Sequence, residues 1–475
     1  MMIRKLLPLL LGATALSACA TVPAYTPPAA PQAAAGPFLG SASPTVSTTA
    51  TADRWWTLYH DARLDRLVED TLAQNTDVRV AVARIERARA QLRGARSQRL
   101  PQTGVTTSAD YGRSAAAQTP VGVDRESWTF DGGLDVSYEV DLFGRVKSGI
   151  TAARGDLEAA EADAAAVRVA VIADTVRAYF DVTTSAERLA VAQQTVALLD
   201  RSIRITSARF EVGRSDRLDV IRVTALRDQQ QAQIPALQAD RDAALFRLAT
   251  LTGRTPQALP TEIANAGTVT PALAQPIPVG DGAALLARRP DVKAAERRLS
   301  ADAARVGVAT ADLYPRITLG GSIGATALGS ANPFTGGPFR WLLGPLINWS
   351  FPNQEPVRAR IAAAKADSAA SLAQFDGTVL RALEETERAL ASYSHALERE
   401  QTLTAARDAA ARAAAISVAR QREGRIDFLT LLDAQRTLAS ADADLAAAKR
   451  AVAFAQVDVF RALGGGWEAA SPPRA

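Results

Sequence analysis

The heptapeptide LAQNTDV spans Leu72 to Val78, and a related heptapeptide, LARRPDV, spans Leu286 to Val292. Further matches follow downstream in the same order: Leu100-Pro101 with Tyr314-Pro315, Val146 with Val357, and Gly213-Arg214 with Gly424-Arg425. A chain that repeats its motifs in one order at nearly constant spacing folds as copies of one structural module. The sequence therefore predicts two repeats, 53–253 and 285–465, with a connection over 254–284 between them.

Each repeat contains one long stretch without proline, 146–212 in the first repeat and 357–423 in the second. As a helix, either stretch would extend about 100 Å at ~1.5 Å per residue. Apolar residues recur within both at spacings of three and four, which predicts amphipathic helices that pack side by side. Gly213 and Gly424 then predict a left-handed helix end and a reversal of the chain. Returning helices are expected over 215–252 and 425–463.

Between the first helix and the long helix of each repeat, apolar and small or polar residues alternate. This period of two predicts four strands, at about 103–112, 128–138, 316–325 and 339–349. Each has about ten residues, the length that a tilted strand needs to cross a bilayer. Aromatic residues near the strand ends predict a membrane-interface girdle, namely Trp128, Tyr138, Trp341 and Trp349. Short strands packed on a soluble domain are the alternative interpretation.

Four strands form an open sheet, and both of its edges carry unpaired backbone groups. Each such group costs several kcal/mol in hydrocarbon, so copies of the chain must share one barrel. Two copies would give 8 strands around a filled interior, whereas three would give 12 strands and begin to enclose a lumen. The predicted fold is a mixed α and β membrane protein, a homotrimer with a 12-stranded barrel and long helices in a cylinder beside it.

The first residues, MMIRKLLPLLLGATALSACA, have the layout of a secretory leader, with a basic pair, an apolar stretch and then small residues. Cys19 is the single cysteine of the chain, and Leu16-Ser17-Ala18-Cys19 resembles the bacterial lipobox. We therefore expect a signal peptide over 1–18 and a lipid on Cys19 that anchors the chain to a membrane. Residues 19–52 are rich in Pro, Ala, Thr and Ser, which predicts a flexible tether. Residues 466–475 are expected to be a tail.

Composition argues against several other functions. Charges of both signs are interspersed, so no nucleic-acid partner is indicated. His60 and His395 are the two histidines and lie far apart in the sequence, which makes a zinc site improbable. The sequence has no glycine-rich phosphate loop and no nucleophile elbow, so we expect no catalysis and no cofactor other than the lipid on Cys19.

Four phrases carry a resemblance to a known family: RWWTLYHDARLDRLVEDTLAQNTDV at 54–78, SYEVDLFGRV at 137–146, LLARRPDVKAAERRLSADAARVGVATADLYPRITL at 285–319 and GRIDFLTLLDAQR at 424–436. In them the chain resembles the TolC-like outer-membrane factors of tripartite efflux pumps, specifically the lipoprotein, NodT-like branch that works with resistance-nodulation-division transporters. The resemblance implies an outer-membrane β-barrel continuous with a periplasmic helical barrel. It also implies a passive exit duct for small molecules such as drugs, with a periplasmic adaptor and an inner-membrane transporter as partners.

The resemblance also assigns residues to the periplasmic entrance. The helix tips, with Gly213, Arg214, Gly424 and Arg425, would narrow the tunnel and meet the adaptor. Asp433 matches the position whose threefold copies form an acidic ring, which can favour cations and respond to pH. Asp219 matches a position in polar links that hold the entrance shut, with Arg217 and Arg422 as candidate partners. Thr430 replaces a second aspartate of some members, so Leu429 or Phe428 would supply an apolar constriction instead.

Three alternatives remain open from the sequence. Any of these charged residues could lie on a solvated helix face without a role in gating. The same duct could serve protein secretion with another inner-membrane partner. A pore-less periplasmic coiled-coil scaffold would explain the lipid and the long helices, but it leaves the four alternating segments without a role.

Overall fold

The structure is a computed structural model. It describes residues 25–29, 34–50, 52–115, 117, 121–122, 124–264, 267, 269–273, 275–328 and 339–466. The expected signal peptide, Cys19 and the tail beyond Gly466 lie outside the described residues. The chain forms two compact units, the first made of Met1–Pro28, Arg84–Glu161 and Ala294–Asp376, the second of Ala29–Ala83, Ala162–Lys293 and Gly377–Ala475.

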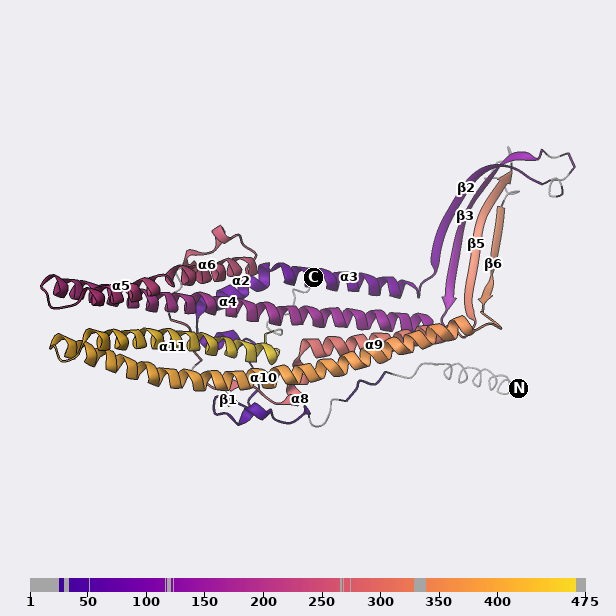
Figure 1. Cartoon of the computed structure of the whole chain (residues 1–475). Helices are drawn as coiled ribbons and strands as arrows, with labels where there is room; N and C mark the ends of the chain where they lie inside the picture. The colour runs from indigo at the N-terminus through magenta and orange to yellow at the C-terminus, as the bar shows by residue number, and fades with distance from the viewer. Residues whose placement is uncertain are drawn as a thin grey trace. The chain divides into compact units, whose positions relative to one another are not determined.

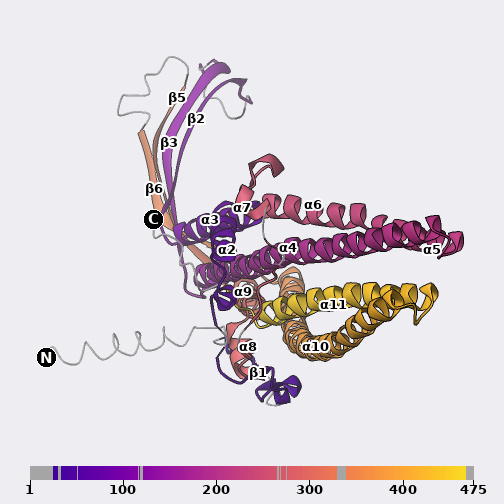
Figure 2. The ribbon, with the colours of Figure 1, turned by 90° about the vertical axis from the view of Figure 1, so that its left-hand side faces the viewer.

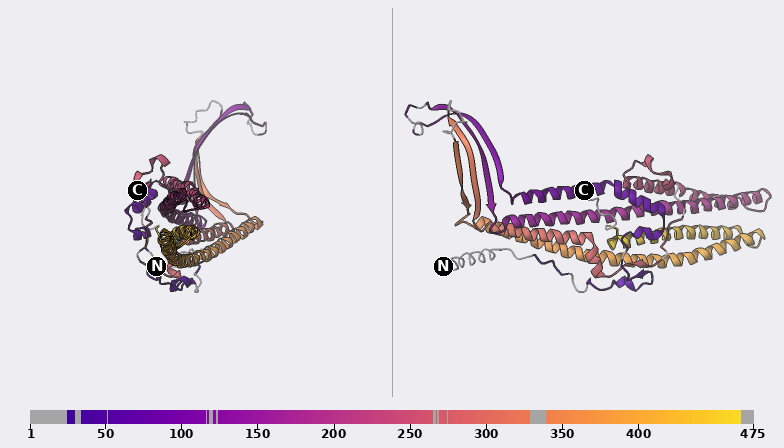
Figure 3. Two further views of the ribbon diagram at one scale, coloured as in Figure 1. Left: turned by 60° about the vertical axis from the view of Figure 1, so that its left-hand side comes forward. Right: turned by 180° about the vertical axis from the view of Figure 1, so that it is seen from behind.

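The first unit contains one four-stranded antiparallel sheet in the order β2-β3-β5-β6. Its strands lie side by side in a curved sheet (Figures 1 and 3). Their bounds are Gln102–Arg113 for β2, Glu126–Val140 for β3, Arg316–Leu328 for β5 and Phe339–Asn348 for β6. Among the described residues, β2 and β6 each pair with one strand, so each leaves one edge of the sheet open.

The two faces of this sheet differ in polarity, as the alternation predicts. Register places Val105, Leu134 and Ile323 in neighbouring positions on one face. The other face carries Asp135 and Ser322, which are also neighbours. Apolar side chains of the first face are exposed in the single chain, and Trp341 is 70% exposed. A contiguous apolar surface of this kind needs an apolar environment.

The helices of the first unit pack through an apolar cluster and a close contact at a glycine. The unit includes parts of α3 (Thr76–Ser97), α4 (Arg145–Glu211), α9 (Pro290–Ala311) and α10 (Glu355–Arg422). Leu92 of α3 packs on Val146 and Ile150 of α4. An added Cβ at Gly155 would lie 3.0 Å from Ala301, so glycine there permits close packing of α4 and α9. Helices α4 and α10 continue into the second unit.

The second unit is mainly helical (Figure 2). It contains α2 (Ala62–Gln74), α5 (Arg217–Gln231), α6 (Ile234–Leu251), α7 (Thr261–Ala264), α8 (Gly282–Arg288) and α11 (Phe428–Ala462). Its short elements are η4 (Leu39–Ala42), η5 (Trp55–Tyr59), η7 (Pro256–Ala258), and the parallel pair β1 (Val46–Ser47) with β4 (Ile277–Pro278).

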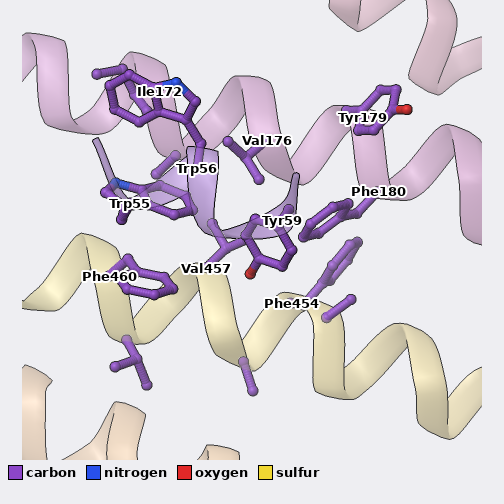
Figure 4. Close-up of a cluster of buried hydrophobic side chains, with 14 of the residues drawn as sticks. Trp55, Trp56, Tyr59, Ile172, Val176, Tyr179, Phe180, Phe454, Val457 and Phe460 are labelled. Carbon is purple, nitrogen blue, oxygen red and sulfur yellow. The ribbon is translucent and has the colours of Figure 1, made fainter. Parts of the chain in front are cut away.

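The core of the second unit forms around the aromatic residues of η5 (Figure 4). Trp55 and Trp56 are almost fully buried, and the Trp55 ring stacks on Phe460 of α11 at 4.7 Å. Tyr59 meets the edge of Phe180 on α4 at 5.0 Å. The segment RWWTLYH therefore joins α4 of the first repeat to α11 of the second. Stacked and edge-to-face aromatic pairs add about 0.5–1.5 kcal/mol each beyond the burial of their area.

The duplicated heptapeptides occupy equivalent junctions between two helices. Asn75 caps α3 by accepting from the backbone N–H groups of Asp77 and Val78, and its Nδ2 donates to the Leu251 carbonyl at 2.9 Å. Arg289, at the matching position, donates to the Ala462 carbonyl at 3.0 Å. In each repeat, this residue links the start of one helix, α3 or α9, to the carboxyl end of the last helix of the repeat, α6 or α11. These equivalent hydrogen bonds explain why the motif occurs twice.

Three details differ from the sequence predictions. The helix expected over 215–252 is divided into α5 and α6, because Pro235 has no N–H to continue the helical hydrogen bonds. The helix expected over 425–463 begins at Phe428, where the Asp427 side chain caps it. The strand expected over 339–349 ends at Asn348, so Trp349 follows it.

Part of the expected tether, 19–52, is ordered. Phe38 and Val46 are buried, and β1 pairs with β4. The Glu387 carboxylate accepts from the backbone N–H groups of Leu39 at 2.7 Å and Gly40 at 3.2 Å. The prediction of flexibility is wrong for these residues, because composition did not reveal the backbone hydrogen bonds that hold them on the second unit.

Arg289 is a buried arginine at the centre of an ionic cluster whose two carboxylates are partly exposed. Its side chain is 9% exposed, and its Nη2 donates to Asp291 and to Glu385 of α10, both at 2.7 Å.

We expect Arg289→Ala to lower the free energy of unfolding by about 3 kcal/mol, because two carboxylates and a buried carbonyl lose their partner. Denaturant titration followed by helical circular dichroism measures this. Arg388→Ala removes an exposed pair with Glu384 on the same helix and should cost about 0.5 kcal/mol or less. Equal effects of both substitutions would contradict the role of the cluster.

The same cluster predicts a pH dependence. Burial alone would raise the pKa of Asp291, but the hydrogen bonds and charge of Arg289 outweigh burial and lower it. The stabilisation is therefore present above the usual aspartate pKa of ~3.9 and is lost as pH falls through the lowered pKa. Asp291→Asn should reduce stability at neutral pH and make its loss toward acid shallower. Unfolding midpoints measured across that pH range test this, with the exposed Asp444→Asn as a control that should keep the wild-type slope.

Candidate channel entrance and membrane surface

The two helical hairpin tips have the same backbone geometry. Gly213 and Gly424 adopt φ values of 71° and 73°, in the left-handed region. The residue after each glycine donates its N–H back to the helix, Arg214 to the Arg209 carbonyl at 2.7 Å and Arg425 to the Arg420 carbonyl at 2.9 Å. This hydrogen-bond pattern ends an α-helix through a left-handed residue, which glycine supplies without steric cost.

Aspartates then start the returning helices. Asp216 accepts from the Leu218 N–H at 2.7 Å, and Asp427 accepts from the Thr430 N–H at 2.8 Å. The Thr430 hydroxyl and N–H together hold the pKa of Asp427 below its usual value. Thr430, the residue that departs from the family pattern, thus helps to fix the start of α11.

The acidic residues assigned to the entrance lie near the starts of the returning helices, Asp219 on the first turn of α5 and Asp433 on the second turn of α11. Asp433 is 62% exposed and pairs with Arg436, one turn further along α11, at 2.7 Å. Asp219 is half-buried and accepts from the Ser215 hydroxyl at 3.1 Å. Both carboxylates therefore lie at the hairpin tips with a partner on their own hairpin.

The assigned arginines are not brought to these carboxylates within one chain. Arg425 pairs with Glu423 at 3.1 Å. In the part of the chain that the structure describes, Arg217 and Arg422 are exposed and form no ion pair. Links from these arginines to Asp219 or Asp433 stay predictions that involve other copies of the chain.

The two apolar residues assigned to a constriction differ in their surroundings. Leu429 is 52% exposed. Phe428 is half-buried and packs with Leu432 of α11 on a cluster formed by Leu199 of α4 with Val223 and Leu226 of α5. Of the two, Leu429 is the one with a free surface in the single chain.

Aromatic residues gather toward both ends of the apolar face of the sheet. Trp128 stands opposite Tyr111 in the register and stacks on Phe130 at 6.0 Å. Trp349 stacks on Phe351 at 4.7 Å and donates its Nε1–H to the Leu313 carbonyl at 3.0 Å. Tyr138 and Trp341 are exposed on the same face. The sequence prediction missed Phe351, which follows the last strand and so falls outside its alternation.

The polar face of the sheet contains a network that the sequence analysis also missed. Asp131 of β3 lies 2.9 Å from Arg340 Nη2 of β6 and accepts from the Thr326 hydroxyl of β5 at 2.6 Å. Arg340 also donates from Nε to Thr326 at 3.1 Å. Three strands are thus joined by one ionic network. Alternation placed Asp131 on the polar face, but only the strand register shows its partners.

The described residues contain neither a membrane-spanning helix nor a metal-binding cluster. None of the helices there combines the length and hydropathy of a membrane-spanning segment. Within the same ranges, His, Cys, Asp and Glu side chains form no group of three or more that could hold a metal ion.

The sheet has one exposed apolar face and two open edges, and the long paired helices end in polar tips. Together these features define the subunit of an outer-membrane channel. The chain belongs to the outer membrane efflux protein family, whose profile matches residues 67–254 and 283–465.

Individual relatives match nearly the whole chain. It is 32% identical to the outer membrane protein OprJ of Pseudomonas aeruginosa, over 97% of this chain and 95% of that protein. It is 30% identical to nodulation protein T of Rhizobium leguminosarum bv. trifolii, over 95% of both. The solved structure of the outer-membrane channel OprN superposes with a TM-score of 0.88 at 37% identity, covering 95% of this chain and all of that one. The protein is therefore an outer-membrane efflux channel with a TolC-like fold.

The acidic ring that the family resemblance assigns to Asp433 would change the conductance of the channel. Asp433→Ala removes the carboxylate that three copies would share, so cation block should weaken and the current through the resting channel should rise. Single-channel recording in planar bilayers measures both. Asp444→Ala, an exposed carboxylate further along α11, is the matched control and should conduct like the wild type. Wild-type currents from a correctly folded Asp433→Ala channel would refute the ring.

Proposed function

We propose that three copies of this chain form the passive exit duct of a tripartite efflux pump for small toxic molecules. The open sheet carries this proposal. Its two unpaired edges and its exposed apolar face are stable in a membrane only when other copies complete the hydrogen bonds. Three copies of four strands give a closed barrel of 12, wide enough for a lumen. The trimeric TolC-like fold of the structural relatives supports this stoichiometry.

The transporter, rather than the channel, selects the cargo in this proposal. Three relatives are similar to this chain to nearly the same degree, yet their names give different cargoes. They are the antibiotic efflux protein ArpC and the toluene efflux protein TtgC, both 29% identical, and the pyoverdine export protein OpmQ, 31% identical, all of Pseudomonas putida. Overall identity therefore does not distinguish cargo. We propose a resistance-nodulation-division transporter as the energised partner.

The helix tips are the proposed contact with the periplasmic adaptor. Gly213 and Gly424 make tight, matching turns, and Arg214 and Arg425 follow them at the exposed ends. Two similar tips per chain would give a trimer six docking points for adaptor hairpins. In the same proposal Asp433 forms the acidic ring, Leu429 narrows the resting entrance, and Asp219, Arg217 and Arg422 form polar links between copies.

Lipid on Cys19 anchors the proposed assembly to the outer membrane. The lipobox-like residues before Cys19 support it. A lipid chain contributes about 0.8 kcal/mol for each buried methylene group, so it adds a tether without crossing the membrane. Cys19→Ala should therefore weaken membrane retention of newly made chains, while assembled trimers stay in the membrane through their barrels.

Drug export in cells tests the proposed function. The protein would be expressed with a transporter and adaptor from the same genome in a strain that lacks its own outer-membrane efflux channels. We expect the minimum inhibitory concentrations of several unrelated compounds to rise severalfold, and to fall back when any one component is omitted. If the trimer reaches the outer membrane and susceptibility to every compound stays unchanged, the efflux proposal is wrong. Export of a co-expressed protein substrate instead would favour the secretion alternative.

Gly424 tests the docking role of the tip. Gly424→Pro should disturb adaptor binding more than trimer formation, because proline cannot adopt the φ of 73° found there. Gly424→Asn is the control, since asparagine tolerates this conformation and nothing lies within 4 Å of an added Cβ. Adaptor pull-down and the mass of the purified trimer give the two readouts. Equal loss of both in Gly424→Pro would count against a docking role.

A further inference from the structure

A hollow of about 200 Å³ lies where the strands of the first unit give way to its long helices. Three segments form it: the end of β3 with the start of α4, the connection from α9 to β5, and the connection from β6 to α10. All three segments belong to the first unit. We call this hollow the junction site. Helices α4 and α10 leave the sheet at this end, so in an outer-membrane channel it is the end nearest the periplasm.

Three arginines line the junction site, and they differ in how firmly their charges are held. Arg145 donates to both oxygens of the Glu139 carboxylate, from Nε at 2.7 Å and from Nη2 at 2.5 Å. Arg316 lies 3.9 Å from Glu139 and 3.7 Å from Asp312, and Arg360 lies 3.5 Å from Asp312. Charge-assisted hydrogen bonds are about 2.7–2.9 Å long. Arg316 and Arg360 are therefore attracted to these carboxylates at distances too long for a good hydrogen bond.

The carboxylates that line the hollow do not satisfy these two arginines. Asp141 accepts from two backbone N–H groups at the start of α4, at 3.0 and 2.8 Å. Glu139 has both of its oxygens bonded to Arg145. Within the lining, this leaves the single negative charge of Asp312 between two guanidinium groups. That part of the junction site therefore has an excess of positive charge.

Aromatic rings stand beside these arginines. Tyr314 and Trp349 line the hollow; the Tyr314 ring stacks on Phe143 at 4.5 Å, and the Trp349 ring stacks on Phe351 at 4.7 Å. Tyr314, Trp349 and Phe351 are each more than one-third exposed in the single chain. Exposed tyrosine and tryptophan rings are typical of the level of lipid headgroups, where hydrocarbon meets water. The junction site therefore lies at the depth where the bilayer ends.

A phosphate group fits this arrangement. Guanidinium groups present pairs of N–H donors that match phosphate oxygens. The side chains of Arg316 and Arg360 are 48% and 61% exposed and come from β5 and α10, so one phosphate could bridge them. Lipid phosphates lie just outside the hydrocarbon layer, and basic pockets beside membrane-spanning segments bind them.

We propose that the junction site binds a phosphate group through Arg316 and Arg360, and that a lipid of the surrounding membrane supplies this phosphate. The acyl chains of the lipid would lie along the apolar face of the sheet, beside Trp349. Asp312 competes with the phosphate for the same two guanidinium groups. Arg145 is already held by Glu139 and takes no part in binding. The inference rests on the membrane location of the sheet and is independent of the proposed cargo.

Lipid binding to the purified full-length protein tests the site. Native mass spectrometry with added phosphatidylglycerol should show about one tightly held lipid per chain. The double variant Arg316→Gln/Arg360→Gln should bind it about tenfold more weakly, because hydrogen bonds to a charged group are lost. Arg358→Gln is the matched control, an exposed arginine on the same turn of α10 that does not line the hollow, and should bind like the wild type. Asp312→Asn should bind severalfold more tightly, because it removes the competing carboxylate.

Two further probes identify the source of the phosphate. A diacylglycerol with the same acyl chains lacks the phosphate and should bind much more weakly than phosphatidylglycerol, and millimolar inorganic phosphate should not displace the lipid. If inorganic phosphate instead binds as tightly as phosphatidylglycerol and also loses affinity in the double variant, the anion site stands and the lipid source is wrong.

The opposite signs of the substitutions keep the test decisive. The proposal is overturned if the double variant, with wild-type trimer mass and strand content, binds phosphatidylglycerol like the wild type, or if Arg358→Gln weakens binding equally. Should the double variant fail to assemble, Arg360→Gln alone must weaken binding and Asp312→Asn must strengthen it; the reverse of either result overturns the site. Drug export does not enter these measurements, so loss of export with normal lipid binding would overturn the proposed function alone.

Discussion

The unpaired backbone groups along β2 and β6 constrain everything else in this protein. A strand edge in water can be solvated, but an edge in hydrocarbon has no alternative to pairing with another strand. The sheet also presents exposed tryptophans, leucines and isoleucines on one face, which water does not favour. Together these features explain why a chain with a well-packed core in its second unit still behaves as a fragment of a larger assembly. The four strands have a function only when a neighbour completes them.

The duplicated motif also explains how one chain positions two long helical hairpins. Asn75 and Arg289 stand at matching positions and bind the carboxyl ends of α6 and α11 respectively. The shared motif thus closes each repeat on itself, while η5 and its aromatic residues join the two repeats into one core. The repeats also differ in their ionic contacts. Arg289 recruits Glu385 into an ionic cluster, and Asp181 of α4 pairs with Arg450 of α11.

Sequence periodicity predicted the strands, the long helices and the glycine turns because these follow local rules. Side chains alternate along a strand, and only glycine readily takes the left-handed turn at 213 and 424. The break before α6 was missed, although Pro235 was its visible signal. The ordered part of the tether was missed because it depends on Glu387, more than three hundred residues away. The Asp131–Arg340 pair was missed for the same reason, because only the tertiary register brings these two residues together. The assignments of Asp433 and Asp219 came from family resemblance, and their roles stay predictions.

Stoichiometry in a membrane-like environment tests the central claim most directly. The claim is that open strand edges force copies of this chain to share one barrel. Native mass spectrometry of the full-length protein, released from detergent micelles, gives the number of chains, and circular dichroism of the same sample gives its strand content. The account predicts a stable complex of three chains that retains β structure. A stable single chain with an intact sheet in the membrane environment would contradict it.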